Sequence, residues 1–278
     1  MARCVQQWSD MLRKWLLLLT LAAPFAVGCA AETSSDEGGI DSSEEPLTRV
    51  TPTEQRAAQS HGLDGLTFQR LTPTSTKLLS ASRYWMEAQD EDTRYPKPRM
   101  CATNVSKVLF LGGVTRYDQE GVRVMLKDVG SAGGLVVKLP QTKGQLIASL
   151  NSTFDKGIIP SGTLVAGLNV HTSQPGDQHI GIIGNVDSKG TLWVYHNNWY
   201  RPENERGVRK PYMVSEANLR RGFARQWMPT PWLTLTRDAS GKITDVKSEL
   251  PALDDMDPLN ADYQVTLAVI PEIKQELR

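Results

Sequence analysis

The chain has 278 residues, of which 40% are hydrophobic and 22% charged, and its 31 basic side chains equal its 31 acidic ones. This balance gives no electrostatic support for nucleic acid as a partner. About 225 residues follow Val50, which is the size of one ordinary domain.

The first 28 residues have the three-part form of a secretory signal. Basic residues precede an apolar run over residues 15–27, and small residues close the run. The run is too short to span a bilayer comfortably. We therefore expect the chain to be exported. Removal of this signal takes away three basic and one acidic side chain, which leaves 28 and 30 and a net charge of −2.

The end of the signal, Ala26-Val27-Gly28-Cys29, resembles the bacterial lipobox. The resemblance implies that Cys29 receives a lipid and becomes the first mature residue. The protein would then be a cell-envelope lipoprotein whose only membrane contact is this anchor. The alternative is an ordinary cleavable signal, in which Cys29 is incidental and the protein is secreted or periplasmic.

Residues 29–50 form an expected flexible linker, because they are rich in Ser, Glu, Asp and Gly and hold few apolar side chains to bury. We therefore divide the chain into a signal peptide at 1–28, a linker at 29–50 and one folded domain at 51–278. Cys101 is the only cysteine of that domain. No structural disulfide is expected within it.

Helices are expected in the first half of the folded domain. Apolar spacing predicts a helix over residues 76–89 and a short buried helix that begins at Cys101 and ends at Gly112 and Gly113. Two further amphipathic segments, at 122–129 and 146–154, also have helical spacing.

The second half has the pattern of β-strands. Alternating and β-branched residues predict strands at 163–170, 179–186, 191–196, 232–236, 242–246 and 263–270. The turn at 187–190 predicts that the second and third of these form a hairpin. Helices followed by an antiparallel sheet indicate an α+β fold.

Cys101 has the position of a nucleophile. A helix start favours the thiolate form of a cysteine, and a main-chain N–H there can face an oxyanion. Four histidines are candidates for its base: His61, His171, His179 and His196. His61 precedes the expected helices and His171 ends a strand beside a polar turn, so position favours His179.

The strand that begins at His179 places this residue on the same face as Gly181, whose missing side chain leaves room beside the imidazole for a helix end. His196 and Asn198 share a face of the next strand, and the hairpin brings both back towards His179. Either side chain can orient the imidazole, although neither can do so by charge.

The segments 100–109, 178–183 and 192–199 together resemble the core of the CHAP and NlpC/P60 group of papain-like cysteine hydrolases, and are closest to CHAP domains. In that group a cysteine opens a helix that packs on an antiparallel sheet, a histidine begins one strand, and a polar residue ends the next. The resemblance covers roughly residues 76–199. It implies a papain-like fold, cleavage of amide bonds and no cofactor, with peptidoglycan or a peptide as the substrate of an amidase or endopeptidase.

By position, the resemblance assigns the nucleophile to Cys101, the base to His179 and the orienting residue to Asn198. The chain departs from the CHAP pattern at His196, which stands where CHAP domains often have a glutamate. A histidine as third residue is typical of the NlpC/P60 branch. The orienting role therefore belongs to either His196 or Asn198.

Other kinds of site have less support. Cys101, His179 and His196 would make three zinc ligands, but no local pair has the close spacing of metal sites, so no metal is expected. The sequence contains no phosphate-binding loop, dinucleotide fingerprint or serine-hydrolase elbow. The alternative function is a non-catalytic envelope lipoprotein of the same fold that binds the cell wall or a partner protein. No immunity or activator protein is identified by the sequence.

Overall fold

The computed structural model describes residues 47, 50–60, 62–63, 65–88, 101–114, 121–173, 178–197, 227–250 and 255–272. All of them belong to the compact unit Ser42–Arg278. The signal peptide, Cys29 and Asn198 lie outside the described residues, as does nearly all of the linker. Within the described ranges, no helix has the length and apolar character needed to cross a membrane.

Four helices lie where apolar spacing predicts them. These are α3 (Pro73–Ala88), α4 (Cys101–Leu111), α5 (Val122–Ser131) and α6 (Lys143–Thr153), and a short 3-10 helix, η1 (Asp155–Gly157), follows the last. Helix α4 ends where Gly113 adopts a φ of 66°, a conformation that glycine adopts without strain. An unpredicted helix, α2 (Pro52–Ser60), is the first of the described helices. The expectation that His61 precedes all helices is therefore wrong.

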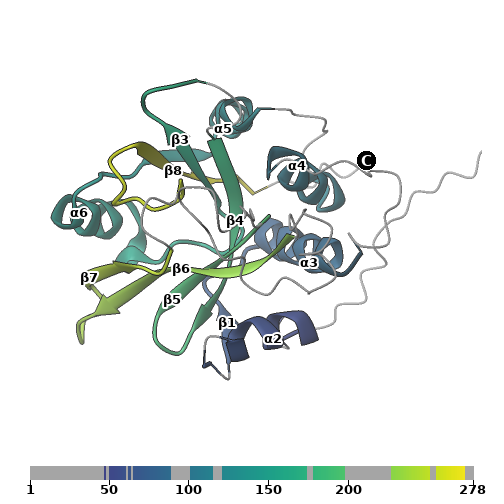
Figure 1. Cartoon of the computed structure of the whole chain (residues 1–278), viewed down its shortest axis with the longest axis horizontal. Coiled ribbons are helices and arrows are strands. Elements are labelled where there is room, and N and C mark those ends of the chain that lie inside the picture. The colour runs from purple at the N-terminus through teal and green to yellow at the C-terminus, as the bar shows by residue number, and fades with distance from the viewer. Residues whose placement is uncertain are drawn as a thin grey trace, which may run out of the picture. The chain divides into compact units, whose positions relative to one another are not determined.

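The strands form one antiparallel sheet in the order β2-β8-β3-β4-β5-β6-β7, with β1 paired to β4. This arrangement, with helices packed against the strands, confirms the α+β class (Figure 1). The predicted hairpin is present as β4 and β5. The strands are β1 (Leu66–Phe68), β2 (Leu135–Lys138), β3 (Leu164–Asn169), β4 (Gln178–Asp187), β5 (Thr191–Asn197), β6 (Trp227–Arg237), β7 (Ile243–Ser248) and β8 (Tyr263–Val269).

Two hydrophobic clusters use the alternating side chains of β4. Ile180 and Ile182 belong to the first cluster, together with apolar residues of α3, α4 and α5. Ile183 belongs to the second, together with residues of α6, β6 and β7. All three isoleucines are fully buried. Because successive residues of a strand point to opposite faces, these clusters mark the two faces of the sheet at β4.

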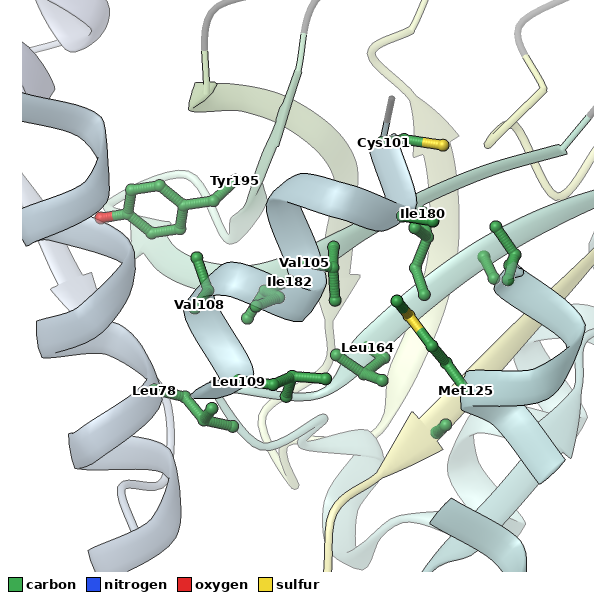
Figure 2. Packing of buried hydrophobic residues seen from close by; sticks show 14 of the residues in the cluster. Leu78, Cys101, Val105, Val108, Leu109, Met125, Leu164, Ile180, Ile182 and Tyr195 are labelled. Carbon is green, nitrogen blue, oxygen red and sulfur yellow. The ribbon is translucent and has the colours of Figure 1, made fainter. Parts of the chain in front are cut away.

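Helix α4 is positioned by its packing on the first cluster. Val105 and Val108 are fully buried, and Figure 2 shows them with Leu109 along the side of the helix that faces Ile180 and Ile182. Burial of large aliphatic side chains contributes about 1.5 to 3 kcal/mol each. This packing fixes the direction of α4 and therefore the place of its first residue.

Candidate functional site

Cys101 is the first residue of α4 and is only 3% exposed. Its sulfur lies 3.5 Å from the main-chain oxygen of Gln178, the residue that begins β4. Figure 2 shows the side chain at the start of the helix, at the end of the cluster that holds Ile180. The fold therefore brings the cysteine to the main chain beside His179, although the two residues are far apart in the sequence.

The pKa of the Cys101 thiol is raised to about 11, first by burial and then by the negative charge of Asp255. Main-chain N–H groups of Ala102, Ile180 and Cys101 itself act in the opposite direction but do not outweigh these two effects. The sequence alone predicts that the helix start favours a thiolate. Burial and the charge of Asp255 instead keep the resting thiol protonated. At neutral pH the thiol is protonated and donates to the Gln178 oxygen.

His179 is joined to two further side chains by hydrogen bonds. Its Nε2 lies 2.8 Å from Nδ1 of His196, and Nε2 of His196 bonds in turn to the hydroxyl of Thr230 on β6. All three residues are at most 7% exposed. The antiparallel pairing explains the last contact, because Thr230 lies opposite Val194, two residues before His196 on β5.

This chain of bonds assigns the proton on each ring. The Thr230 hydroxyl donates to the main-chain oxygen of Val194 at 3.4 Å, so it accepts from Nε2–H of His196. Nδ1 of a neutral His196 is then an acceptor, and Nε2 of His179 must be the donor. A neutral His179 therefore carries its basic lone pair on Nδ1, the nitrogen that a catalytic base would use.

Gly181 makes room for β5 and not for a helix end. A Cβ atom at Gly181 would lie 2.7 Å from the main-chain oxygen of Tyr195 and 3.0 Å from Cβ of His196. The missing side chain of Gly181 does leave room beside His179, but strand β5 occupies this room and helix α4 does not. This close approach places His196 beside His179 on the same face of the sheet.

Cys101 and His179 reach the start of β4 from different sides. The cysteine packs in the cluster of Ile180, whereas the imidazole, two residues before Gly181, lies on the face that carries Ile183. The structure thus brings the thiol to the main chain of Gln178 and brings His179 to His196. Cys29 and the alternative partner Asn198 lie outside the described residues.

Two further residues of the site were missed in the sequence. Thr230 belongs to the early part of β6, which begins at Trp227 and not, as predicted, at residue 232. Asp255 acts on Cys101 by charge from a turn that has no periodic pattern. A predicted strand that began at residue 227 would have placed Thr230 opposite β5. No local sequence pattern indicates Asp255.

The described residues include no group of three His, Cys, Asp or Glu side chains that could hold a metal ion. In comparisons with known proteins, the chain matches no protein-family model, no curated protein and no solved structure. The function is therefore argued from the geometry of the site and from the motifs of the sequence.

Proposed function

We propose that the protein is an exported cysteine hydrolase that cleaves amide bonds, with Cys101 as nucleophile, His179 as base and His196 as the residue that orients the base. The observation that supports this most is the hydrogen-bond chain from Thr230 through His196, because it sets the tautomer of His179 in which Nδ1 is basic. A buried structural histidine needs a partner, but it does not need this particular tautomer.

The chemistry follows from a neutral thiol. His179 takes the proton from Cys101 while the sulfur attacks the amide carbonyl, since a thiol of pKa about 11 does not form a stable ion pair in advance. The C–N bond breaks as His179 returns the proton to the leaving amine. Water then hydrolyses the thioester, with His179 accepting its proton and returning it to the sulfur. The main-chain N–H of Cys101, at the start of α4, would stabilise the oxyanion.

The substrate class and the location rest on the sequence. The resemblance to CHAP and NlpC/P60 domains supports peptidoglycan or a peptide as the substrate, with no cofactor. The signal and the residues before Cys29 support a lipid-anchored protein of the cell envelope. Asn198 remains the alternative residue for orienting His179.

The test is digestion of purified peptidoglycan, followed by mass spectrometry of the released fragments. Cys101→Ala should abolish cleavage, His179→Ala should nearly do so, and the double variant should be scarcely worse, because coupled catalytic groups are not additive. His171→Ala is the matched control, since the side chain of this histidine is 70% exposed and bonds to Asp262. Cleavage by Cys101→Ala, or additive losses, would show that the chemistry lies elsewhere.

A second function is favoured by the state of the thiol. A cysteine that is 3% exposed and protonated also suits a non-catalytic lipoprotein that binds the cell wall or a partner protein. That function predicts that Cys101→Ala leaves wall binding unchanged and that no fragments are released by the wild-type protein. A co-sedimentation assay with purified peptidoglycan, run beside the digestion, separates the two.

A further inference from the structure

We infer that Trp85 of α3 and Asn104 of α4 are positioning residues of this site, because their hydrogen bond fixes the first turn of α4 and with it the Cys101 thiol. The inference rests on the proposed function and deepens it, since it explains how a helix held largely by apolar contacts delivers its first residue to one place. Both residues act through the helix and not on the substrate.

The bond joins two buried side chains near the start of α4. Asn104 lies one turn after Cys101 and is fully buried. Its side-chain oxygen accepts a hydrogen bond of 2.9 Å from the indole N–H of Trp85, which is 3% exposed. A buried amide oxygen costs free energy unless a donor meets it within a narrow range of distance and angle. The bond therefore favours one separation of the two helices and one rotation of α4.

Lys107 gives α4 a second contact with the same indole. Its ammonium nitrogen lies 5.7 Å from the centroid of the Trp85 ring, within the range of a cation–π interaction. Lys107 follows Asn104 by three residues, so the two contacts come from successive turns of α4. Trp85 thus meets α4 through both its N–H and its ring, and this double contact opposes rotation of the helix about its axis.

The other ends of the two helices meet through an apolar contact. A Cβ atom at Gly112, just beyond α4, would lie 3.1 Å from Cδ2 of Leu78. Helices α3 and α4 therefore run antiparallel, with Trp85 beside the start of α4 and Leu78 beside its end. Apolar contacts have no preferred direction, whereas a hydrogen bond does. The directional contact thus lies at the end of α4 that carries Cys101.

A small slip of α4 is enough to disable such a site. A shift by one residue moves the start of a helix by about 1.5 Å along its axis and turns it by about 100°. Misplacement of a reacting group by about 1 Å can lower a rate about a hundredfold. The Cys101 thiol now lies 3.5 Å from the Gln178 oxygen and is 3% exposed, so a slip would also open it to reagents in solution.

The test compares alkylation of Cys101 with global stability and needs no substrate. Trp85→Phe removes the indole N–H but keeps an aromatic ring, and Asn104→Leu removes the acceptor. Each variant should be labelled by iodoacetamide about tenfold faster, because the buried thiol becomes accessible once the first turn is released. The double variant should be labelled no faster than the single ones, because both remove the same bond. Mass spectrometry of the peptide that carries Cys101 separates its labelling from that of the other two cysteines.

Val108→Ala is the matched control. Val108 is fully buried in the same helix, seven residues after Cys101, so its truncation weakens the fold without removing the Trp85–Asn104 bond (Figure 2). Labelling is measured in a series of low urea concentrations, beside the free energy of unfolding. Local opening of the first turn depends little on urea, whereas labelling through global unfolding rises steeply with it. Trp85→Phe should therefore show fast labelling that depends little on urea, and Val108→Ala should not.

The inference is wrong if labelling follows the free energy of unfolding equally in all variants, or if the double variant shows additive gains. Hydrolysis of peptidoglycan by Trp85→Phe should also fall about tenfold to a hundredfold. Undiminished hydrolysis by this variant would overturn the inference too. Should Trp85→Phe not fold, Asn104→Leu takes its place against Val108→Ala. A wild-type protein that cuts no peptidoglycan would refute the proposed function, while the labelling would still decide whether the bond positions Cys101.

Discussion

Two buried polar clusters meet on consecutive residues of β5. Tyr195 points into one and His196 into the other, because neighbouring residues of a strand face opposite sides of the sheet. The Tyr195 cluster is built on the carboxylate of Glu54, whereas the hydrogen bonds of the His196 cluster join two imidazole rings and a hydroxyl. The two clusters are similarly buried, but the Tyr195 cluster holds the charged pair of Glu54 and Arg83. We expect it to serve stability, and the His196 cluster to serve catalysis.

Both oxygens of the Glu54 carboxylate accept hydrogen bonds. Arg83 donates to both oxygens of Glu54, at 3.0 and 2.8 Å, and the N–H of Thr51 donates to one of them at 2.9 Å. The hydroxyl of Tyr195 also bonds to Glu54 and lies 3.0 Å from Asn185. Burial, and then the Glu54 charge, raise the pKa of Tyr195 well above its ordinary value, so the phenol stays a donor. Such a cluster holds α2 and α3 to the sheet.

The largest effect on stability is expected at Glu54. Glu54→Ala leaves the Arg83 guanidinium without its counter-charge, and loss of one partner from a buried pair costs about 3 to 5 kcal/mol of unfolding free energy. Urea denaturation measures this loss. Glu87→Ala is the control, because Glu87 also joins α2 to α3, through Thr53, but is exposed, and it should cost under about 1 kcal/mol. Equal losses of unfolding free energy for the two variants would show that the buried Glu54 cluster stabilises the fold no more than an exposed hydrogen bond does.

The His196 cluster should affect rate more than stability. His196→Ala removes the acceptor that fixes the tautomer of His179, so hydrolysis should fall about tenfold to a hundredfold, equal to about 1.4 to 2.7 kcal/mol of barrier. His196→Asn should recover part of the rate, because its side-chain oxygen takes the place of Nδ1. The comparison with Asn198→Ala, at matched thermal stability, assigns the role. A larger loss for Asn198→Ala would give it to Asn198.

The smallest effect on the rate of hydrolysis is expected at Thr230, where the chain of hydrogen bonds from His179 ends. Thr230→Val keeps the shape of the side chain but removes the acceptor of His196 Nε2–H, so the wrong tautomer of both rings becomes accessible. Initial rates of hydrolysis should fall about threefold to tenfold. Thr230→Ser retains the hydroxyl and should behave like wild type. If Thr230→Val is as damaging as His196→Ala, the hydroxyl has a role beyond setting the tautomer.

The parts of the fold with a regular apolar pattern were predictable from the sequence. The four helices α3 to α6 and the strands β3 to β8 follow that pattern. Helix α2 does not, because its buried face consists of Ala57, Ala58 and the carboxylate of Glu54. Such a helix is stabilised by Arg83 and Tyr195 from other elements, which apolar spacing cannot reveal.

The contact between the two histidines of the candidate site was predictable from the sequence, but the electrostatics of the site were not. The order of Cys101, His179 and His196 along a helix and a hairpin predicts that they meet at one end of β4. The structure shows the two histidines in contact and the thiol at the main chain of Gln178. The pKa of Cys101 depends instead on how deeply α4 is buried and on Asp255, a residue 154 positions away in the chain. Both are properties of the tertiary structure.

Helix α2 is the first described helix after the segment expected to act as a tether. If that segment ends in a lipid, any mechanical force on the anchored protein enters the folded unit at Pro52–Ser60. Glu54 would transmit this force to α3 and β5 through several short bonds that act in parallel. Tension from the anchor would therefore load the bonds of the charged cluster, which lies on the opposite face of β5 from His196.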